Sequence, residues 1–112
     1  DFLNIPLSQY LKVLIEEKGC TKAQVIRDSG LNRRFFFDIL SNKRKPSRNY
    51  VLRILIALQM PLIDVQWLLG ATGYAQLYAR DKHDSVLIYC INHHNSVNDC
   101  NAMLEKINLE LI

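Results

Sequence analysis

Residues that cross-link or conformationally restrict a small protein are few in this sequence. It contains three cysteines, four glycines and three prolines among 112 residues. The cysteines, Cys20, Cys90 and Cys100, stand at unrelated spacings, which disfavours a secreted disulfide framework and favours a reducing cytosol. Charged or polar residues interrupt every apolar run before it reaches the roughly 18 residues that a membrane-spanning helix needs. The sequence therefore predicts a cytoplasmic protein without a membrane anchor.

The residues that are present fit one ordinary folded protein. Apolar residues make up 49% of the chain and charged residues 22%, as in globular domains rather than in disordered tails. At this length, folding buries roughly two-thirds of the surface that the unfolded chain exposes, so one core needs no metal or disulfide. The chain begins with Asp1 rather than methionine, which leaves open whether a segment precedes it.

Charge is distributed unevenly along the chain. Residues 1–60 hold 11 Lys and Arg against 5 Asp and Glu, a net charge of +6, whereas residues 61–112 hold 3 against 6, a net charge of −3. A basic half joined to an acidic half indicates one face for a polyanion and another for a different purpose. A solvated surface that happens to be rich in lysine and arginine is the alternative interpretation.

Helical periodicity dominates the chain, because apolar residues recur every three or four positions. We expect helices over residues 6–18, 21–29, 33–40, 47–58, 61–70, 81–92 and 96–106. Thr21 and Gln24 have the spacing of a capping box, and Gly30 suits a left-handed helix end. No stretch alternates apolar and polar residues for long enough to indicate a sheet. The expected fold class is all-α.

The expected helices divide into two parts, a five-helix domain at residues 1–70 and a C-terminal helical hairpin at residues 71–112. An internal similarity at an offset of 35 residues links the last two helices of the first part to the hairpin. The matching positions are Val51-Leu52 with Val86-Leu87, Ile56 with Ile91, Leu62 with Val97, Asp64 with Asp99, and Leu68-Leu69 with Met103-Leu104. Duplication and chance similarity of two amphipathic hairpins are both open interpretations.

The most informative segment is TKAQVIRDSGLNRRFFFDILSNKRKPS, at residues 21–47. It combines two short helices with a turn at Gly30, and such a turn fixes a steep crossing that lets the second helix, residues 32–40, enter a DNA major groove. Over about residues 7–70 the chain resembles the XRE/Cro-like helix-turn-helix family of phage-repressor type. The resemblance rests on Thr21, Gly30-Leu31-Asn32-Arg33, Ile39 and Lys43-Arg44-Lys45-Pro46-Ser47. It implies a five-helix DNA-binding domain.

The resemblance also implies roles for individual residues. Phe36, Ile39 and Leu40 would be held in the core, and the candidates for contact with base edges would be Arg33, Arg34, Phe37 and Asp38. Arginine suits guanine, because its guanidinium donates two parallel hydrogen bonds to O6 and N7. The candidates for phosphate contact would be Thr21, Lys22, Asn32, Lys43, Arg44, Lys45, Ser47 and Arg48.

Three departures from the family pattern bear on the function. The family usually has glutamine at or near position 22 and small or polar residues around positions 35 and 37, where this chain has Lys22, Phe35 and Phe37. Exposed phenylalanines on a groove-reading helix would contact thymine methyl groups or wedge into the duplex. They would equally serve as anchors for a protein partner, in which case the fold is an adaptor. Asp38 repels phosphate unless it pairs with Arg34 or accepts from a cytosine amine.

Other residue clusters support a specific chemistry less well. Cys90, His93, His94 and Cys100 include metal-ligand types, but their spacing matches no zinc pattern, and core cysteines beside helix-end histidines are the favoured interpretation. Cys20 and Ser85 have no catalytic partner nearby in sequence. Trp67, Tyr74, Tyr78 and Tyr89 would either stack on bases or, as is commoner, pack in the core or an interface. We therefore expect neither an enzyme nor a cofactor.

Together these features predict a sequence-specific regulator of transcription, with repression favoured, that binds double-stranded DNA and is associated with the nucleoid. The acidic C-terminal hairpin would cap the domain, form a homodimer or bind a protein partner, and it would face away from DNA. The alternative is a protein-binding adaptor that docks through Phe35 and Phe37.

Overall fold

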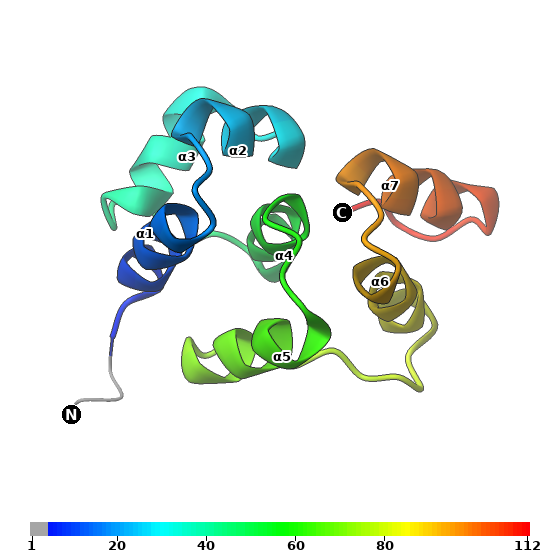
Figure 1. The fold of residues 1–112 in the computed structure, drawn as a ribbon. Coiled ribbons are helices and arrows are strands. Elements are labelled where there is room, and N and C mark those ends of the chain that lie inside the picture. Colours follow the sequence, from blue (N-terminus) through cyan, green and yellow to red (C-terminus); the bar gives the residue numbers. More distant parts are fainter. Residues whose placement is uncertain (1–4) are drawn as a thin grey trace.

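The computed structural model of the chain describes residues 5–112 and has seven α-helices and no strand within that range (Figure 1). The helices are α1 (Leu7–Glu17), α2 (Lys22–Ser29), α3 (Arg33–Leu40), α4 (Arg48–Ala57), α5 (Leu62–Ala71), α6 (Lys82–Asn92) and α7 (Val97–Lys106). The all-helical class expected from the sequence is confirmed. Residues 1–4, which open the expected N-terminal domain, lie outside the described residues.

Local capping chemistry explains where the helices begin and end. Thr21 and Gln24 form the expected capping box of α2, and Gly30 ends that helix in the left-handed conformation with a φ of 68°. Asn32 caps α3 by accepting a hydrogen bond of 3.1 Å from the Phe35 amide. Ser96 caps α7 in a second capping box. These short-range signals placed the helix boundaries within about a residue of those in the structure.

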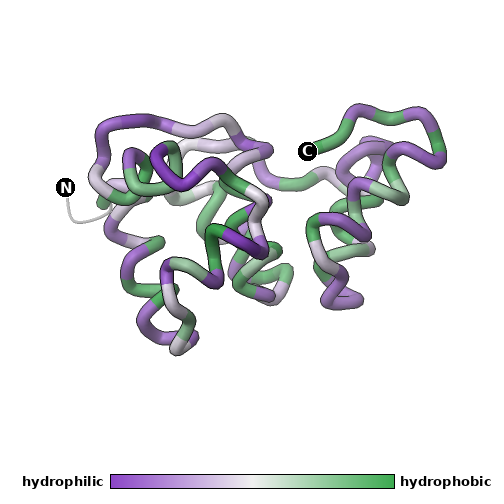
Figure 2. The backbone as a smooth tube through the Cα atoms, turned by 90° about the horizontal axis from the view of Figure 1, so that it is seen from above, coloured by the Kyte–Doolittle hydropathy of each residue, from purple (hydrophilic) through white to green (hydrophobic). Residues whose placement is uncertain are grey.

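Helix α4 lies at the centre of the molecule, between α1–α3 on one side and the hairpin of α6 and α7 on the other (Figure 1). Apolar and polar residues alternate along the outer helices in Figure 2, as expected for helices with one buried face. Five of the ten residues of α4 are buried, namely Val51, Leu52, Ile54, Leu55 and Ile56. A helix with this much buried surface has two packed faces, and α4 therefore belongs to both halves of the core.

An arginine on α4 joins the two halves of the chain. Arg53 donates from Nε to the carbonyl of Ser29 at 2.8 Å and from Nη1 to the carbonyl of Ile112 at 2.8 Å. The first carbonyl belongs to the end of α2, and the second to the segment after α7. Arg53 thus holds the turn between α2 and α3 against the C-terminal segment.

The internal similarity at an offset of 35 residues extends to the backbone. Gln59 after α4 and His94 after α6 have positive φ values of 53° and 54°, and Gly73 after α5 and Asn108 after α7 have values of 87° and 59°. Each pair is separated by 35 residues. The amides that close α5 and α7 also match, with Tyr74 N bonded to Leu69 O and Leu109 N to Leu104 O. The same positive-φ ending also closes α1, α2 and α3, at Gly19, Gly30 and Asn42. We call α4 and α5 the first hairpin and α6 and α7 the second hairpin, since their helix ends stand 35 residues apart.

Within residues 5–112, none of the helices is long and apolar enough to cross a membrane.

Candidate nucleic-acid interface

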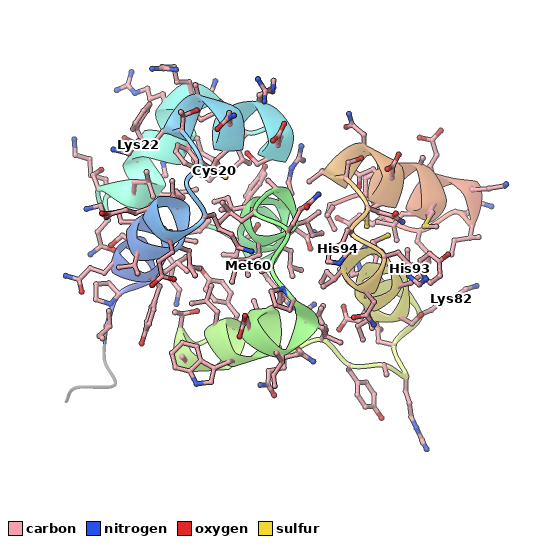
Figure 3. The ribbon with its side chains drawn as sticks, viewed as in Figure 1. Cys20, Lys22, Met60, Lys82, His93 and His94 are labelled. Carbon is pink, nitrogen blue, oxygen red and sulfur yellow. The ribbon has the colours of Figure 1, made fainter. Side chains whose placement is uncertain are left out.

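The candidate interface begins with the N-terminal caps of α2 and α3. The side-chain oxygen of Thr21 accepts a hydrogen bond from the Gln24 amide at 3.1 Å, and that of Asn32 accepts from the Phe35 amide. Capping uses each side chain as an acceptor only. The hydroxyl of Thr21 and the amide of Asn32 also carry donor protons. Both exposed side chains therefore keep a donor for a phosphate oxygen. Lys22 is exposed at the first position of α2, near Cys20 (Figure 3).

The inner face of α3 agrees with the expectation from the sequence. Phe36, Ile39 and Leu40 are buried, and Arg33 and Arg34 are exposed at the beginning of the helix. Two exposed guanidinium groups at a helix N-terminus project from a fixed base, since the caps on either side of the turn hold the helix in place.

Phe35 and Phe37 differ from the expectation of outward-facing rings. Both are half-buried and pack against the core. The Phe35 ring meets the Tyr50 ring edge to face, with centroids 5.0 Å apart, and the Phe37 ring meets Phe36 in the same way at 5.7 Å. The sequence pattern missed this burial because Tyr50 reaches Phe35 from another helix.

The half-buried rings support basic side chains of the candidate interface. The Arg33 guanidinium lies over the Phe37 ring at 5.2 Å from its centroid, and the Arg44 guanidinium lies over the Phe35 ring at 5.4 Å. A cation over the face of an aromatic ring is attracted by the ring quadrupole, and a flat guanidinium is also held in orientation. Phe35 thus links α3 to the basic loop, and Phe37 supports Arg33 within α3.

The basic loop at residues 41–47 is held at several points. The carbonyl of Asp38 accepts hydrogen bonds from the amides of Lys43 and Arg44 at 2.9 and 3.3 Å. At the other end, the Tyr74 hydroxyl donates to the carbonyl of Pro46 at 2.6 Å, and the Lys45 ammonium lies 5.4 Å from the centroid of the Tyr74 ring. Burial raises the pKa of Tyr74, so its hydroxyl keeps the proton that it donates.

The side chains of this loop remain available to a ligand. Lys43, Arg44 and Lys45 are exposed on a fixed backbone. Ser47 is exposed at the N-cap of α4, and its side chain makes no capping hydrogen bond. Asp38 is half-buried, and the two ion pairs within residues 5–112 join Arg27 to Asp28 and Arg48 to Asp84, so Asp38 is not paired with Arg34.

Arg48 differs from the other phosphate candidates, because its guanidinium is bound within the protein. It donates to both carboxylate oxygens of Asp84 at 3.0 and 2.8 Å, and to the carbonyls of Ala75 and Gln76 at 2.9 and 3.1 Å. Its donors therefore fix α6 and the linker between α5 and α6, residues 72–81, onto α4. The sequence offered no signal for this pairing, since Arg48 and Asp84 stand 36 residues apart.

The buried Asp84 is ionised at neutral pH. Burial would raise its pKa, but hydrogen bonds from Arg48 and from the Tyr78 amide, together with the charges of Arg48 and His83, lower it below the ordinary value. The Arg48–Asp84 pair is thus a structural clamp, and we leave Arg48 out of the interface. The remaining set, which we call the cationic face, consists of Thr21, Lys22, Asn32, Arg33, Arg34, Lys43, Arg44, Lys45 and Ser47.

The cluster of cysteines and histidines does not form a metal site. Cys90 and Cys100 are buried between α6 and α7, while His93 and His94 are exposed at the end of α6 (Figure 3). Burial, and next the neighbouring Cys90, raises the pKa of the Cys100 thiol, which disfavours the thiolate that binds a metal. Among residues 5–112, the one group with ligand atoms close together is Asp81, His83 and Asp84.

That acidic group already has protein partners. Asp84 is bound by Arg48, Asp81 accepts from the Asp84 amide at 2.9 Å, and Nε2 of His83 lies 2.7 Å from the carbonyl of Glu110. Its side chains therefore serve the fold of the second hairpin.

Comparison of the chain with protein families, with curated proteins and with solved structures finds no match.

Proposed function

We propose that this protein binds double-stranded DNA through the cationic face and regulates transcription, with repression as the favoured role. In this proposal α3 lies in the major groove, and Arg33 and Arg34 contact base edges. Phe37 and Asp38 lie behind these arginines, because both are half-buried. The loop at residues 41–47, Thr21, Lys22 and Asn32 bind phosphates on either side.

One observation carries the proposal, namely that Arg33 is held over the Phe37 ring and Arg44 over the Phe35 ring. A cation held in place loses less rotamer freedom when it binds, and positioned cations of this kind suit the charge of a nucleic-acid backbone. The same contacts weigh against the adaptor alternative, because rings that are half-buried and covered by guanidinium groups offer little apolar surface to a protein.

The first test is a titration of the protein against duplex DNA of random sequence at two salt concentrations. We expect affinity to fall steeply with salt, because phosphate binding releases counterions. Lys43→Ala should weaken binding to all sequences alike and reduce the slope against log salt by about 1. Arg80→Ala is the matched control, since Arg80 is an exposed arginine that does not belong to the cationic face.

Specific recognition is tested on a duplex obtained by selection from random sequences. Arg33→Ala should cost about 1–3 kcal/mol on this duplex and relax discrimination at one base pair. A folded protein that binds no duplex at low salt would overturn the proposal. Unchanged specificity in the Arg33 and Arg34 variants would overturn the assignment of α3.

A further inference from the structure

The helix ends of the two hairpins stand 35 residues apart, but a face that is covered in the first hairpin is open in the second. Val51, Ile54 and Leu68 in the first hairpin are buried. Thirty-five residues later stand Val86, Tyr89 and Met103, of which Val86 and Met103 are half-buried and Tyr89 is 48% exposed. A surface that is fully covered in one hairpin is therefore open in the other.

The open positions line a groove of about 410 Å³ between α6 and α7, formed by Ser85, Val86, Tyr89, Met103, Lys106 and Ile107. We call it the outer groove. The other faces of the two hairpins are already in use, because Arg48 is bound to Asp84, and Leu87 and Ile91, the counterparts of Leu52 and Ile56, are buried. In the first hairpin Leu68, the counterpart of Met103, lies beside Tyr10 and Leu14 of α1, so a helix is the natural cover of this face.

Charge along α7 indicates which helices form that cover. Asp99, Met103 and Lys106 share one face of the helix, with the exposed Asp99 one turn before Met103 and the exposed Lys106 one turn after it. If two α7 helices pack antiparallel about Met103, Lys106 of each lies opposite Asp99 of the other. A surface that is complementary to itself is the requirement for a two-fold interface.

We propose that the outer groove binds the outer groove of a second copy of this chain, with the two α7 helices antiparallel. Tyr89, whose ring stacks on His93, and Ile107 are the apolar anchors, since both line the groove and are partly exposed and a tyrosine contributes large contact area at low entropic cost. Lys106 and Asp99 at the rim fix the antiparallel direction. The inference does not depend on DNA binding, although a symmetric pair would suit a regulator that reads two half-sites.

Sedimentation equilibrium of the full chain tests the inference. We expect a reversible dimer whose dissociation constant rises at least about tenfold in Tyr89→Lys, as for an anchor worth more than about 1.4 kcal/mol. Tyr78→Lys is the matched control, because Tyr78 is 60% exposed in the linker outside the groove, and it should leave the dimer unchanged. Lys106→Asp should also weaken the dimer, by placing two aspartates opposite each other.

Circular dichroism confirms that each variant is folded, so loss of the dimer is not confused with loss of structure. A monomeric wild-type chain would overturn the inference and point to a helix of another protein as the occupant. A dimer that resists Tyr89→Lys would overturn it as well, because the interface would lie on another face. A monomer that still binds random duplex DNA would leave the proposed function intact.

Discussion

At the level of single residues, the structure gives a physical role to the phenylalanines that set this chain apart from the helix-turn-helix pattern. Sequence reasoning predicted which residues of α3 are buried, because Phe36, Ile39 and Leu40 follow the helical period. It treated Phe35 and Phe37 as exposed. The partners of Phe37 lie within α3, but those of Phe35, Tyr50 and Arg44, come from later in the chain. Local periodicity contains no information about such partners, and this part of the candidate site needed the structure.

Substitution of Phe37 by leucine tests the platform that the ring provides. Phe37→Leu keeps an apolar side chain but removes the ring beneath Arg33, so we expect a loss of about 0.5–1 kcal/mol on the selected duplex and less on random DNA. Phe35→Leu, which frees the loop residue Arg44, should weaken binding to both duplexes equally. Fluorescence anisotropy measures the loss of affinity of each variant on the two duplexes. A Phe37→Leu loss that is the same on the selected and the random duplex would contradict the assigned roles.

At the level of helices, short-range chemistry made most of the fold predictable. The capping residues Thr21, Asn32 and Ser96 and the glycine after α2 each act within one turn of their own helix. The contacts that arrange the helices span longer distances in sequence and leave no local pattern. Arg53 shows the difference, since its bonds to Ser29 and Ile112 cross 24 and 59 residues.

Gly30 and Gly19 form a matched pair for testing the Arg53 contact. Both have a φ of 68°, but a Cβ on Gly30 would lie 2.6 Å from Nη2 of Arg53, whereas a Cβ on Gly19 meets nothing within 4 Å. Alanine at either position costs about 1–2 kcal/mol for the left-handed backbone. Gly30→Ala should lower the free energy of unfolding further, because the Arg53 side chain is displaced. Urea denaturation of both variants measures the difference, and equal losses would show that Arg53 adjusts freely.

At the level of the whole molecule, the expected division into residues 1–70 and 71–112 is crossed by several bonds. Arg48 binds Asp84, Arg53 binds the Ile112 carbonyl, and Gln66 exchanges hydrogen bonds of 2.8 and 2.7 Å with the backbone of Leu77. The shift in net charge between residues 1–60 and 61–112 was visible in the sequence. The clamps across it were not, since an arginine in a basic segment has the same sequence signature whether it binds phosphate or a distant aspartate.

The Arg48–Asp84 clamp makes stability depend on pH. The folded pKa of Asp84 is lower than the unfolded value of about 3.9, so its contribution is fully present above that value and is lost as the pH falls through the folded pKa. Asp84→Asn should therefore cost roughly 1.5–3 kcal/mol at neutral pH, and the gap to wild type should close in acid. Asp28→Asn, in the exposed Arg27 pair, should change little. Thermal unfolding from neutral to acidic pH measures both, and a gap independent of pH would contradict the role of the charge.

The position of α4 between two packed layers has a consequence for how the sequence can change over evolutionary time. Substitutions in α4 disturb two interfaces at once, because its side chains are buried toward the N-terminal helices and toward the second hairpin. The second hairpin repeats the same spacing of helices with one face left uncovered by the rest of the chain, so substitutions on that face disturb the core less than substitutions in α4. A repeated element of this kind lets one hairpin carry a new surface while the other continues to hold the fold.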